Sequence, residues 1–415
     1  MTFCRKLKTP MPGGRLRRAL CIVFGIATLF LCSESCCAQN AGADGGGLLQ
    51  DAARSMVAGN LQQAETDLQT LLHANPHEYR ALNLLGMIRA QQQRNADAEK
   101  IFKSVIEQNP NFAGAHVNLG LLYLQTSRTD DAIAQFQEAL RLEPGRADAL
   151  GALLNILRVQ AREAVHAGDL EKALSLLIQA RKASPQNSDV LYDFGIVALR
   201  MSLFADAAQA FRGVLAIRPD DANALYGLGR AQIGLGKYQD AAETFSRYAK
   251  LHPQDASGHY ALGIALASLE KSEEARAQFQ KSVELQPEQT ESYLQLGRIC
   301  LDAGDLDCAA ADFDRVLRRD PRHAEALAGM GRMEFQRKDY PKAIGVLQQS
   351  IDLDPTSRQA HYYLGLAYAR MGRSEDSAKE LQLATKIEHD EVVQHRTILK
   401  LLDSIQNGDA SKQAP

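Results

Sequence analysis

The sequence lacks several features that would assign it to a common class of protein. It has no tryptophan, only 6% aromatic residues, and a longest apolar run of 13 residues, at 19–31. A bilayer-spanning helix needs about 20 such residues. Its 47 basic and 50 acidic residues give a formal charge of -3, which removes the electrostatic case for a nucleic-acid partner. Composition also excludes collagen-like, disordered and multi-span membrane proteins.

Cysteine is scarce outside the N-terminal segment, which holds five of the seven cysteines within its first 37 residues. Six basic residues precede the apolar run 19–31, and the small residues Cys36-Cys37-Ala38 follow it. This order is typical of a secretory signal peptide. We expect cleavage after Ala38, so that residues 1–38 are the signal peptide and the mature protein is periplasmic or secreted, with 41 basic against 49 acidic residues. The alternative is an uncleaved inner-membrane anchor formed by residues 19–32.

The prolines are the first sign of an internal repeat. Nine of the thirteen are spaced 34 residues apart, except for one interval of 41. They are Pro76, Pro110, Pro144, Pro185, Pro219, Pro253, Pro287, Pro321 and Pro355. An alanine stands twelve residues before each, a phenylalanine or leucine eight before each, and a glycine ten after eight of the nine. Such a period indicates a repeat array rather than two or three globular domains.

Each 34-residue unit predicts two helices. Apolar and small residues six, nine and ten positions after a proline, such as Leu225, Leu228 and Gly229, share one face of the first helix. The next proline ends the second helix, because its ring clashes with the preceding turn and it has no N–H. We expect the repeated glycine and alanine where two helix backbones approach closely, with the phenylalanine or leucine beside that contact.

These Leu-Gly, Ala, Phe and Pro positions resemble the tetratricopeptide repeat family over about residues 45–391. The stretch contains nine proline-closed units and a tenth, 358–391, in which His389 stands in the proline position. The resemblance implies an all-α fold, a right-handed superhelical solenoid of helix-turn-helix repeats. It also implies a concave groove lined mainly by the first helices, and binding of protein or peptide partners without naming one.

One unit and both ends depart from the pattern. The unit at 147–187 carries seven extra residues, two helical turns, which predicts a first helix extended over 147–166. This helix marks either a bend between units or a neutral insertion. Residues 39–44 are expected to be a linker. A C-terminal capping helix is expected at 391–407, with Asp390 as its N-cap, followed by a disordered tail at 408–415.

No enzyme, metal or cofactor signature emerges from the sequence. His77-Glu78 has no histidine three residues on, so the zinc-protease motif fails, and the glycines at 227–236 fall on the repeat rather than after a strand. His116, His259 and His361 share one repeat position, where other units place leucine or tyrosine, and we interpret them as packing residues.

Two cysteines remain after the expected cleavage, Cys300 and Cys308. They stand on the two helices of one hairpin, at positions that hold Arg89 with Asp97 and Glu334 with Lys342 in other units. These charge pairs suggest that the two positions face each other. A disulfide is therefore possible in an oxidising compartment, and the alternative is two unpaired thiols.

The candidate binding residues lie on the face of the first helices opposite the glycine. Positions seven and eleven after the prolines carry Tyr192, Tyr226, Tyr260, Arg230, Arg298 and Arg332, and the later Tyr362 continues the series. Tyrosine and arginine dominate binding hot spots, and arginine grips carboxylates. We expect these residues to hold an extended or helical partner segment. In the alternative, the tyrosines pack between hairpins and the arginines pair with Glu291 and Glu325.

The sequence therefore predicts a non-catalytic protein-interaction scaffold or adaptor of the cell envelope, with no cofactor, no nucleic-acid partner and no membrane span after cleavage. The main alternative is an accessory subunit of an export or polysaccharide glycosyl-transfer complex. A membrane-anchored assembly factor would differ only in keeping its leader. The family's clamp for acidic C-terminal tails is not supported, because Asn118 and Asn155 stand without the lysines it needs.

Overall fold

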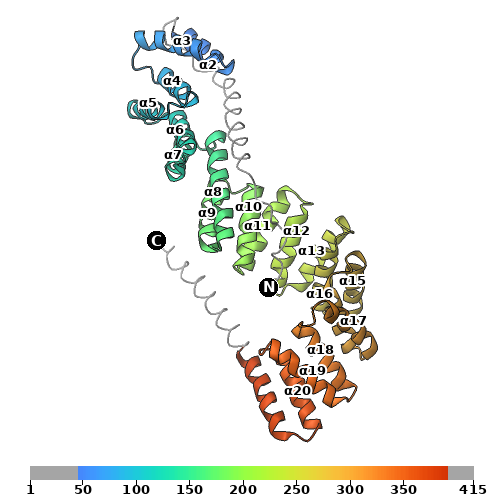
Figure 1. Ribbon diagram of the computed structural model, residues 1–415. Helices are drawn as coiled ribbons and strands as arrows, with labels where there is room; N and C mark the ends of the chain where they lie inside the picture. Colours follow the sequence, from blue (N-terminus) through green and yellow to red (C-terminus); the bar gives the residue numbers. More distant parts are fainter. Residues whose placement is uncertain (1–44, 391–415) are drawn as a thin grey trace, which may run out of the picture. The chain divides into compact units, whose positions relative to one another are not determined.

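A computed structural model describes residues 45–390, all of whose regular elements are helices (Figure 1). The expected signal peptide, the linker, the capping helix at 391–407 and the tail lie outside these residues. The chain divides into two compact units, 1–194 and 195–415. None of the described helices is long and apolar enough to cross a membrane.

The first unit contains four complete helical hairpins and the start of a fifth. Its helices are α2 (Gly45–Val57), α3 (Leu61–Ala74), α4 (Tyr79–Gln91), α5 (Asn95–Gln108), α6 (Ala113–Gln125), α7 (Thr129–Leu142), α8 (Ala147–Ala167), α9 (Leu170–Ala183) and the first part of α10 (Ser188–Arg200).

The second unit continues the same alternation of first and second helices. It comprises the rest of α10, then α11 (Phe204–Ile217), α12 (Ala222–Gly234), α13 (Tyr238–Leu251), α14 (Ala256–Ala267), α15 (Ser272–Leu285), α16 (Thr290–Asp302), α17 (Leu306–Arg319), α18 (Ala324–Gln336), α19 (Tyr340–Leu353), α20 (Arg358–Arg370) and a helix over residues 374–390. Asp390 is the last residue of this helix that the structure describes, and the helix for which it was expected to be the N-cap lies outside the described residues.

Short polar side chains cap the start of some helices, and the repeated proline follows the end of each second helix from α3 to α19. The Asp221 side chain accepts a hydrogen bond from the Ala224 N–H at 2.9 Å, and Asp305 does the same for Cys308 at 3.0 Å. Each bond satisfies an N–H that has no partner within its own helix. Pro219 follows the C-cap of α11, where the chain can no longer continue as a helix.

The core is divided among neighbouring hairpins instead of forming one centre. The nine repeated alanines are fully buried, and the nine phenylalanines and leucines eight residues before the prolines are at most 1% exposed. Buried clusters join adjacent hairpins, for example Ala241, Phe245 and Phe279 across α13 and α15. The largest buried side chain recurs once per unit, which is the packing that a repeat array requires.

The sequence led us to expect the repeated glycine where two helix backbones approach each other closely. In the structure this glycine instead makes room for an aromatic ring. A Cβ atom added at Gly263 would lie 2.6 Å from the ring of Phe279, and one added at Gly297 would lie 2.8 Å from Phe313. The glycine of the first helix therefore forms the wall against which the second helix of the same hairpin packs its largest side chain.

We expect Gly263→Ala to lower the free energy of unfolding by about 1–3 kcal/mol, because the added methyl displaces the Phe279 ring. Gly345 is a matched control, since it is an exposed glycine inside α19 with nothing within 4 Å of an added Cβ. Gly345→Ala should raise the same quantity by about 0.5–1 kcal/mol, because alanine loses less backbone entropy on folding. Urea unfolding followed by circular dichroism measures both. Equal effects at the two sites would contradict the packing role.

The seven-residue insertion lengthens one helix without breaking it. Helix α8 runs over 21 residues, against 12 to 14 residues for each of the helices α2–α7 and α9–α20. Arg158 of α8 donates to Asp193 at 2.6 Å and to Asp189 at 3.2 Å, both in the first half of α10. Ion pairs within the first unit therefore fasten the lengthened helix to its neighbour.

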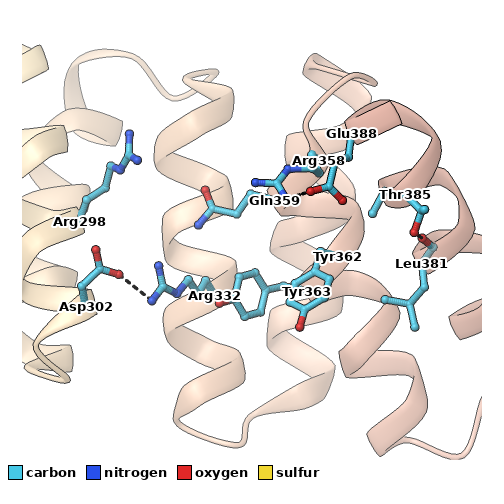
Figure 2. A pocket seen from close by; sticks show the side chains of 11 residues that line it. Arg298, Asp302, Arg332, Arg358, Gln359, Tyr362, Tyr363, Leu381, Thr385 and Glu388 are labelled. Atoms are coloured by element: carbon cyan, nitrogen blue, oxygen red, sulfur yellow. Dashed lines mark hydrogen bonds and ion pairs between the residues drawn. The ribbon is translucent and has the colours of Figure 1, made fainter. Parts of the chain in front are cut away.

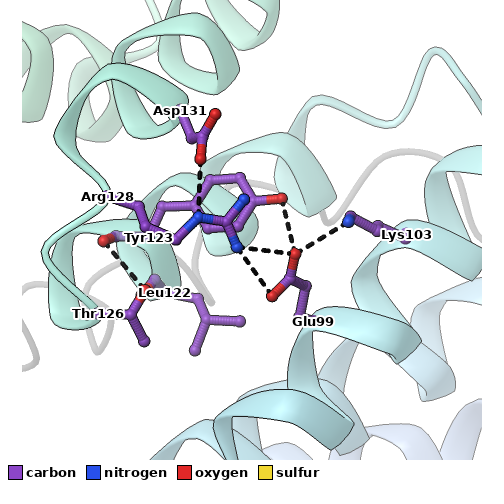
Figure 3. A network of polar contacts seen from close by, with 7 residues as sticks. All are labelled: Glu99, Lys103, Leu122, Tyr123, Thr126, Arg128 and Asp131. Carbon is purple, nitrogen blue, oxygen red and sulfur yellow. Dashed lines mark hydrogen bonds and ion pairs between the residues drawn. The ribbon is translucent and has the colours of Figure 1, made fainter.

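Polar contacts also join neighbouring hairpins in the first unit (Figure 3). The Glu99 carboxylate of α5 accepts hydrogen bonds from Arg128 at 3.0 Å and from the Tyr123 hydroxyl at 3.2 Å, and it pairs with Lys103. These hydrogen bonds, with that from Lys103 the largest cause, hold the pKa of Glu99 below its usual value. Arg128 also stacks on the Tyr123 ring, 4.1 Å from its centroid. The carboxylate thus connects the α4–α5 hairpin to the α6–α7 hairpin.

Candidate functional site

A pocket of about 500 Å³ lies among the last hairpins of the second unit (Figure 2). The first helices α16, α18 and α20 and the helix over 374–390 supply its walls. Its lining residues are Arg298, Asp302, Arg332, Arg358, Gln359, Tyr362, Tyr363, Leu381, Ala384, Thr385 and Glu388. We refer to this site as the arginine pocket.

Three successive first helices each contribute one arginine to the pocket. Arg332 pairs with Asp302 of the preceding first helix, with 2.7 Å between Nη2 and the carboxylate oxygen. Arg358 pairs more loosely with Glu388, at 3.4 Å. Arg298 is exposed and has no ion pair or hydrogen bond within residues 45–390. The alternative pairing of these arginines with Glu291 and Glu325 is not observed for Arg332.

Arg332 holds a donor without an acceptor. Its Nε atom is buried and has no hydrogen-bond partner among residues 45–390, although the guanidinium lies 5.5 Å from the centroid of the Tyr363 ring. A buried donor left unpaired costs about 1–3 kcal/mol in desolvation. Such groups are uncommon in native proteins, so each one calls for an explanation.

Tyr362 is the most exposed member of the tyrosine series. It is 46% exposed, and its ring meets that of Tyr363 edge to face at 5.2 Å between centroids. An exposed tyrosine beside arginines offers a large contact surface for a partner side chain.

Two of the predicted tyrosines are more engaged in packing. The Tyr226 ring lies 5.6 Å from Phe245 and 5.5 Å from Tyr248, and the Tyr260 ring lies 5.8 Å from Phe279. Burial raises the pKa of both hydroxyls. Each tyrosine packs onto the second helix of its own hairpin and keeps only part of its surface for a partner.

The remaining predicted residues fall into two places. Arg230 is exposed on α12, four residues from Tyr226. Tyr192 is half-buried on α10 in the first unit, and it already has a partner there. Of the six predicted residues, the structure brings Arg298 and Arg332 together in the arginine pocket.

The sequence pattern could have pointed to part of what it missed. Gln359 and Tyr362 stand four and seven residues after Pro355, on the same helical face as the predicted positions. Arg358 and Tyr363 lie beside that face, and the helix over 374–390 lines the same pocket with Leu381, Ala384, Thr385 and Glu388. No periodicity within one unit carries that information.

Cys300 and Cys308 are joined by a disulfide between α16 and α17, with their Cα atoms 5.8 Å apart. The equivalent pair Glu334 and Lys342 also meets, at 2.5 Å. The other expected pair is wrong, because Arg89 binds Glu65 of the preceding hairpin at 2.6 Å. The two positions therefore face each other, but a long arginine can reach across to the neighbouring unit instead.

The three repeated histidines each form hydrogen bonds that connect their first helix to other parts of the chain. His361 contacts Glu380 through Nδ1 at 2.6 Å and the Pro355 carbonyl through Nε2 at 3.1 Å. His116 and His259 meet Gln135 and Gln278 in the same way, both at 2.8 Å. They are structural hydrogen-bonding residues rather than side chains that only fill space.

The sequence matches the family described as tetratricopeptide repeat at residues 56–111, 89–149, 117–162, 158–222, 192–256, 226–290 and 294–358. A second profile of that description matches 334–401. The chain belongs to the tetratricopeptide repeat family. Proteins of this family bind protein or peptide partners and generally act as non-catalytic scaffolds.

Several solved structures are similar. YrrB, described as a repeat protein of this family with an unusual peptide-binding site, shares 25% identity over 44% of this chain and 95% of its own, with a TM-score of 0.38. The Cut9–Hcn1 hetero-tetramer shares 14% identity over 85% and 95%, with a TM-score of 0.47. MamA from Desulfovibrio magneticus RS-1 shares 22% over 41% and 96%, with a TM-score of 0.37. A comparison with curated proteins found no match.

Proposed function

We propose that this protein is a non-catalytic scaffold or adaptor that binds a segment of another protein along its first helices, with the arginine pocket as the principal contact. The observation that carries the proposal is the convergence of three first helices on one pocket that contains an exposed tyrosine and an unsatisfied arginine donor. Such a combination of aromatic and arginine side chains is typical of interface hot spots.

The repeat architecture supports binding of a segment rather than of a small molecule. Each first helix contributes only a few side chains, so a ligand must extend over several hairpins to gather useful contact area. Arg298, Arg332 and Arg358 belong to three consecutive hairpins, and an extended or helical peptide meets all three in turn.

We also propose that the protein works in the cell envelope or outside the cell. Two independent features support export: the basic, apolar and small-residue order of residues 5–38, and the disulfide between the two remaining cysteines. Disulfides persist in oxidising compartments and are rare in the cytosol.

Co-purification from the native host tests the binding function. We expect the tagged full-length protein to retain a partner that is lost from Arg332→Gln/Tyr362→Ala. The partner should be kept by Arg200→Gln/Arg212→Gln, a control pair of exposed arginines away from the pocket. A third variant, Tyr226→Ala/Arg230→Glu, shows whether the contact extends to α12. If circular dichroism shows that the pocket variant is folded and the variant still retains the partner, the assignment is refuted.

A further inference from the structure

We propose that the arginine pocket selects acidic segments: the partner places Asp or Glu carboxylates against Arg332 and Arg358 and an apolar side chain against Tyr362. This inference rests on the proposed binding function and names the chemistry of the partner. It depends on the unsatisfied donor, the loosely engaged arginines, the distribution of acids and the apolar wall.

The strongest pointer is the donor set of Arg332. A guanidinium presents five N–H donors in a planar fork, and a carboxylate can accept two of them in parallel. Asp302 engages Nη2 at 2.7 Å, which leaves the buried Nε without an acceptor. Asp302 also shows that a carboxylate fits against this guanidinium, whose side chain is 20% exposed.

The other two arginines can bind a partner carboxylate with little loss of the protein's own stability. Arg298 has no ionic partner within the described part of the chain, and the Arg358–Glu388 pair spans 3.4 Å with both side chains more than half exposed. Exposed pairs of this kind contribute about 0–1 kcal/mol. A partner carboxylate can therefore replace Glu388 at Arg358 with little loss of internal stability.

Acidic side chains on the same face of the first helices should confine the acidic part of the ligand to one end of that face. Asp302 and Glu388 border the pocket itself, against three arginines. Glu291 and Glu325 lie near Tyr260, because both contribute to raising the pKa of its hydroxyl, although burial is the larger cause. The carboxylates of a ligand should consequently lie over α18 and α20, while a neutral stretch continues towards α14 and α16.

An apolar wall adds a second requirement. Leu381 and Ala384 line the pocket beside Tyr362, whose ring is nearly half exposed. One apolar side chain of the ligand gains contact there, whereas a charged side chain placed against this wall would lose its hydration without gaining a hydrogen-bond partner. The pocket is therefore suited to an acidic segment with an interspersed apolar residue.

Selection from a random library of 12-residue peptides displayed on phage tests the inference with the full-length protein. We expect selected peptides to be enriched in Asp and Glu, and the enrichment to vanish with Arg332→Gln/Arg358→Gln but to persist with Arg200→Gln/Arg212→Gln. The control removes the same charge, and both variants are checked for an unchanged melting temperature. Replacing Asp and Glu by Asn and Gln in the best peptide should weaken its Kd by at least about tenfold.

The outcomes separate this inference from the proposed function. No enrichment in acidic residues, or an enrichment that survives in Arg332→Gln/Arg358→Gln, overturns the acidic selection. If the selected peptides are neutral and their binding is lost with Tyr362→Ala, the groove still binds protein segments and only the chemistry of the partner is wrong. If no peptide binds any form of the protein, both are wrong.

Discussion

Phe313→Ala should lower the free energy of unfolding around α16–α19 by about 3–5 kcal/mol. The Phe313 ring is 0% exposed and lies between two glycines. Added Cβ atoms at Gly297 and Gly329 would approach it to 2.8 Å and 2.5 Å. Truncation leaves a cavity whose walls come from α16 and α18. These walls cannot collapse without moving the first helices that carry Arg298 and Arg332.

Hydrogen exchange resolved by peptide mass spectrometry measures this effect where it occurs, because a repeat array loses stability locally. Protection should fall in α16–α18 and remain unchanged in α2–α7. Phe313→Leu is the matched control, since leucine stands at the equivalent positions 177 and 347, and it should cost about 1–2 kcal/mol. A uniform loss of protection over the whole chain would mean that the array unfolds as one cooperative body.

Reduction of the Cys300–Cys308 disulfide should lower the stability of the α16–α17 hairpin by about 2–3 kcal/mol, from the loop entropy of a crosslink across eight residues. The bond joins the helix that carries Arg298 and Asp302 to its partner helix, so reduction should also weaken binding at the arginine pocket. Urea unfolding with and without a phosphine reductant measures the change.

The double variant Cys300→Ser/Cys308→Ser provides the control, because it should not respond to the reductant. A thiol count on the unfolded chain from Gln39 onward, without reductant, is an independent check. We expect no free thiol, and a count of two would show that the cysteines are unpaired.

The repeat lattice predicted the helices well because the determinants are local. A proline after each second helix and one buried phenylalanine or leucine per hairpin are set within 34 residues. The role of the repeated glycine was less accessible. That role depends on a ring of the facing helix. The sequence alone does not show whether Gly263 lies against the backbone of that helix or against the Phe279 ring.

The site was predictable only in part, because it is assembled between units. Arg298 and Arg332 followed from their positions on the exposed face of the first helix. Arg358 could not be predicted in this way, because its partner in the pocket, Glu388, lies on the helix over 374–390. The error at Arg89 has the same origin: its partner Glu65 belongs to the preceding hairpin, and its position within one unit pointed to Asp97 instead.

Stability and binding are therefore expected to be linked in this protein. The arginine pocket has no scaffold apart from the hairpins that form it, and each of those hairpins relies on one buried ring and its glycine. A substitution that loosens α16–α17 displaces Arg298 and Asp302 without touching the pocket, and it should weaken the partner's binding while the distant repeats stay folded.

The most direct test of the account is site-specific photo-crosslinking of the full-length protein in its native host, with benzophenone-bearing phenylalanine at position 362 or at position 212. Tyr362 lines the arginine pocket, whereas Arg212 is exposed on the second helix α11. The account predicts a crosslinked partner from position 362, none from position 212, and loss of the adduct when Arg298→Gln/Arg332→Gln is added. Equal crosslinking from both positions, or an adduct that persists in the arginine variant, would contradict it.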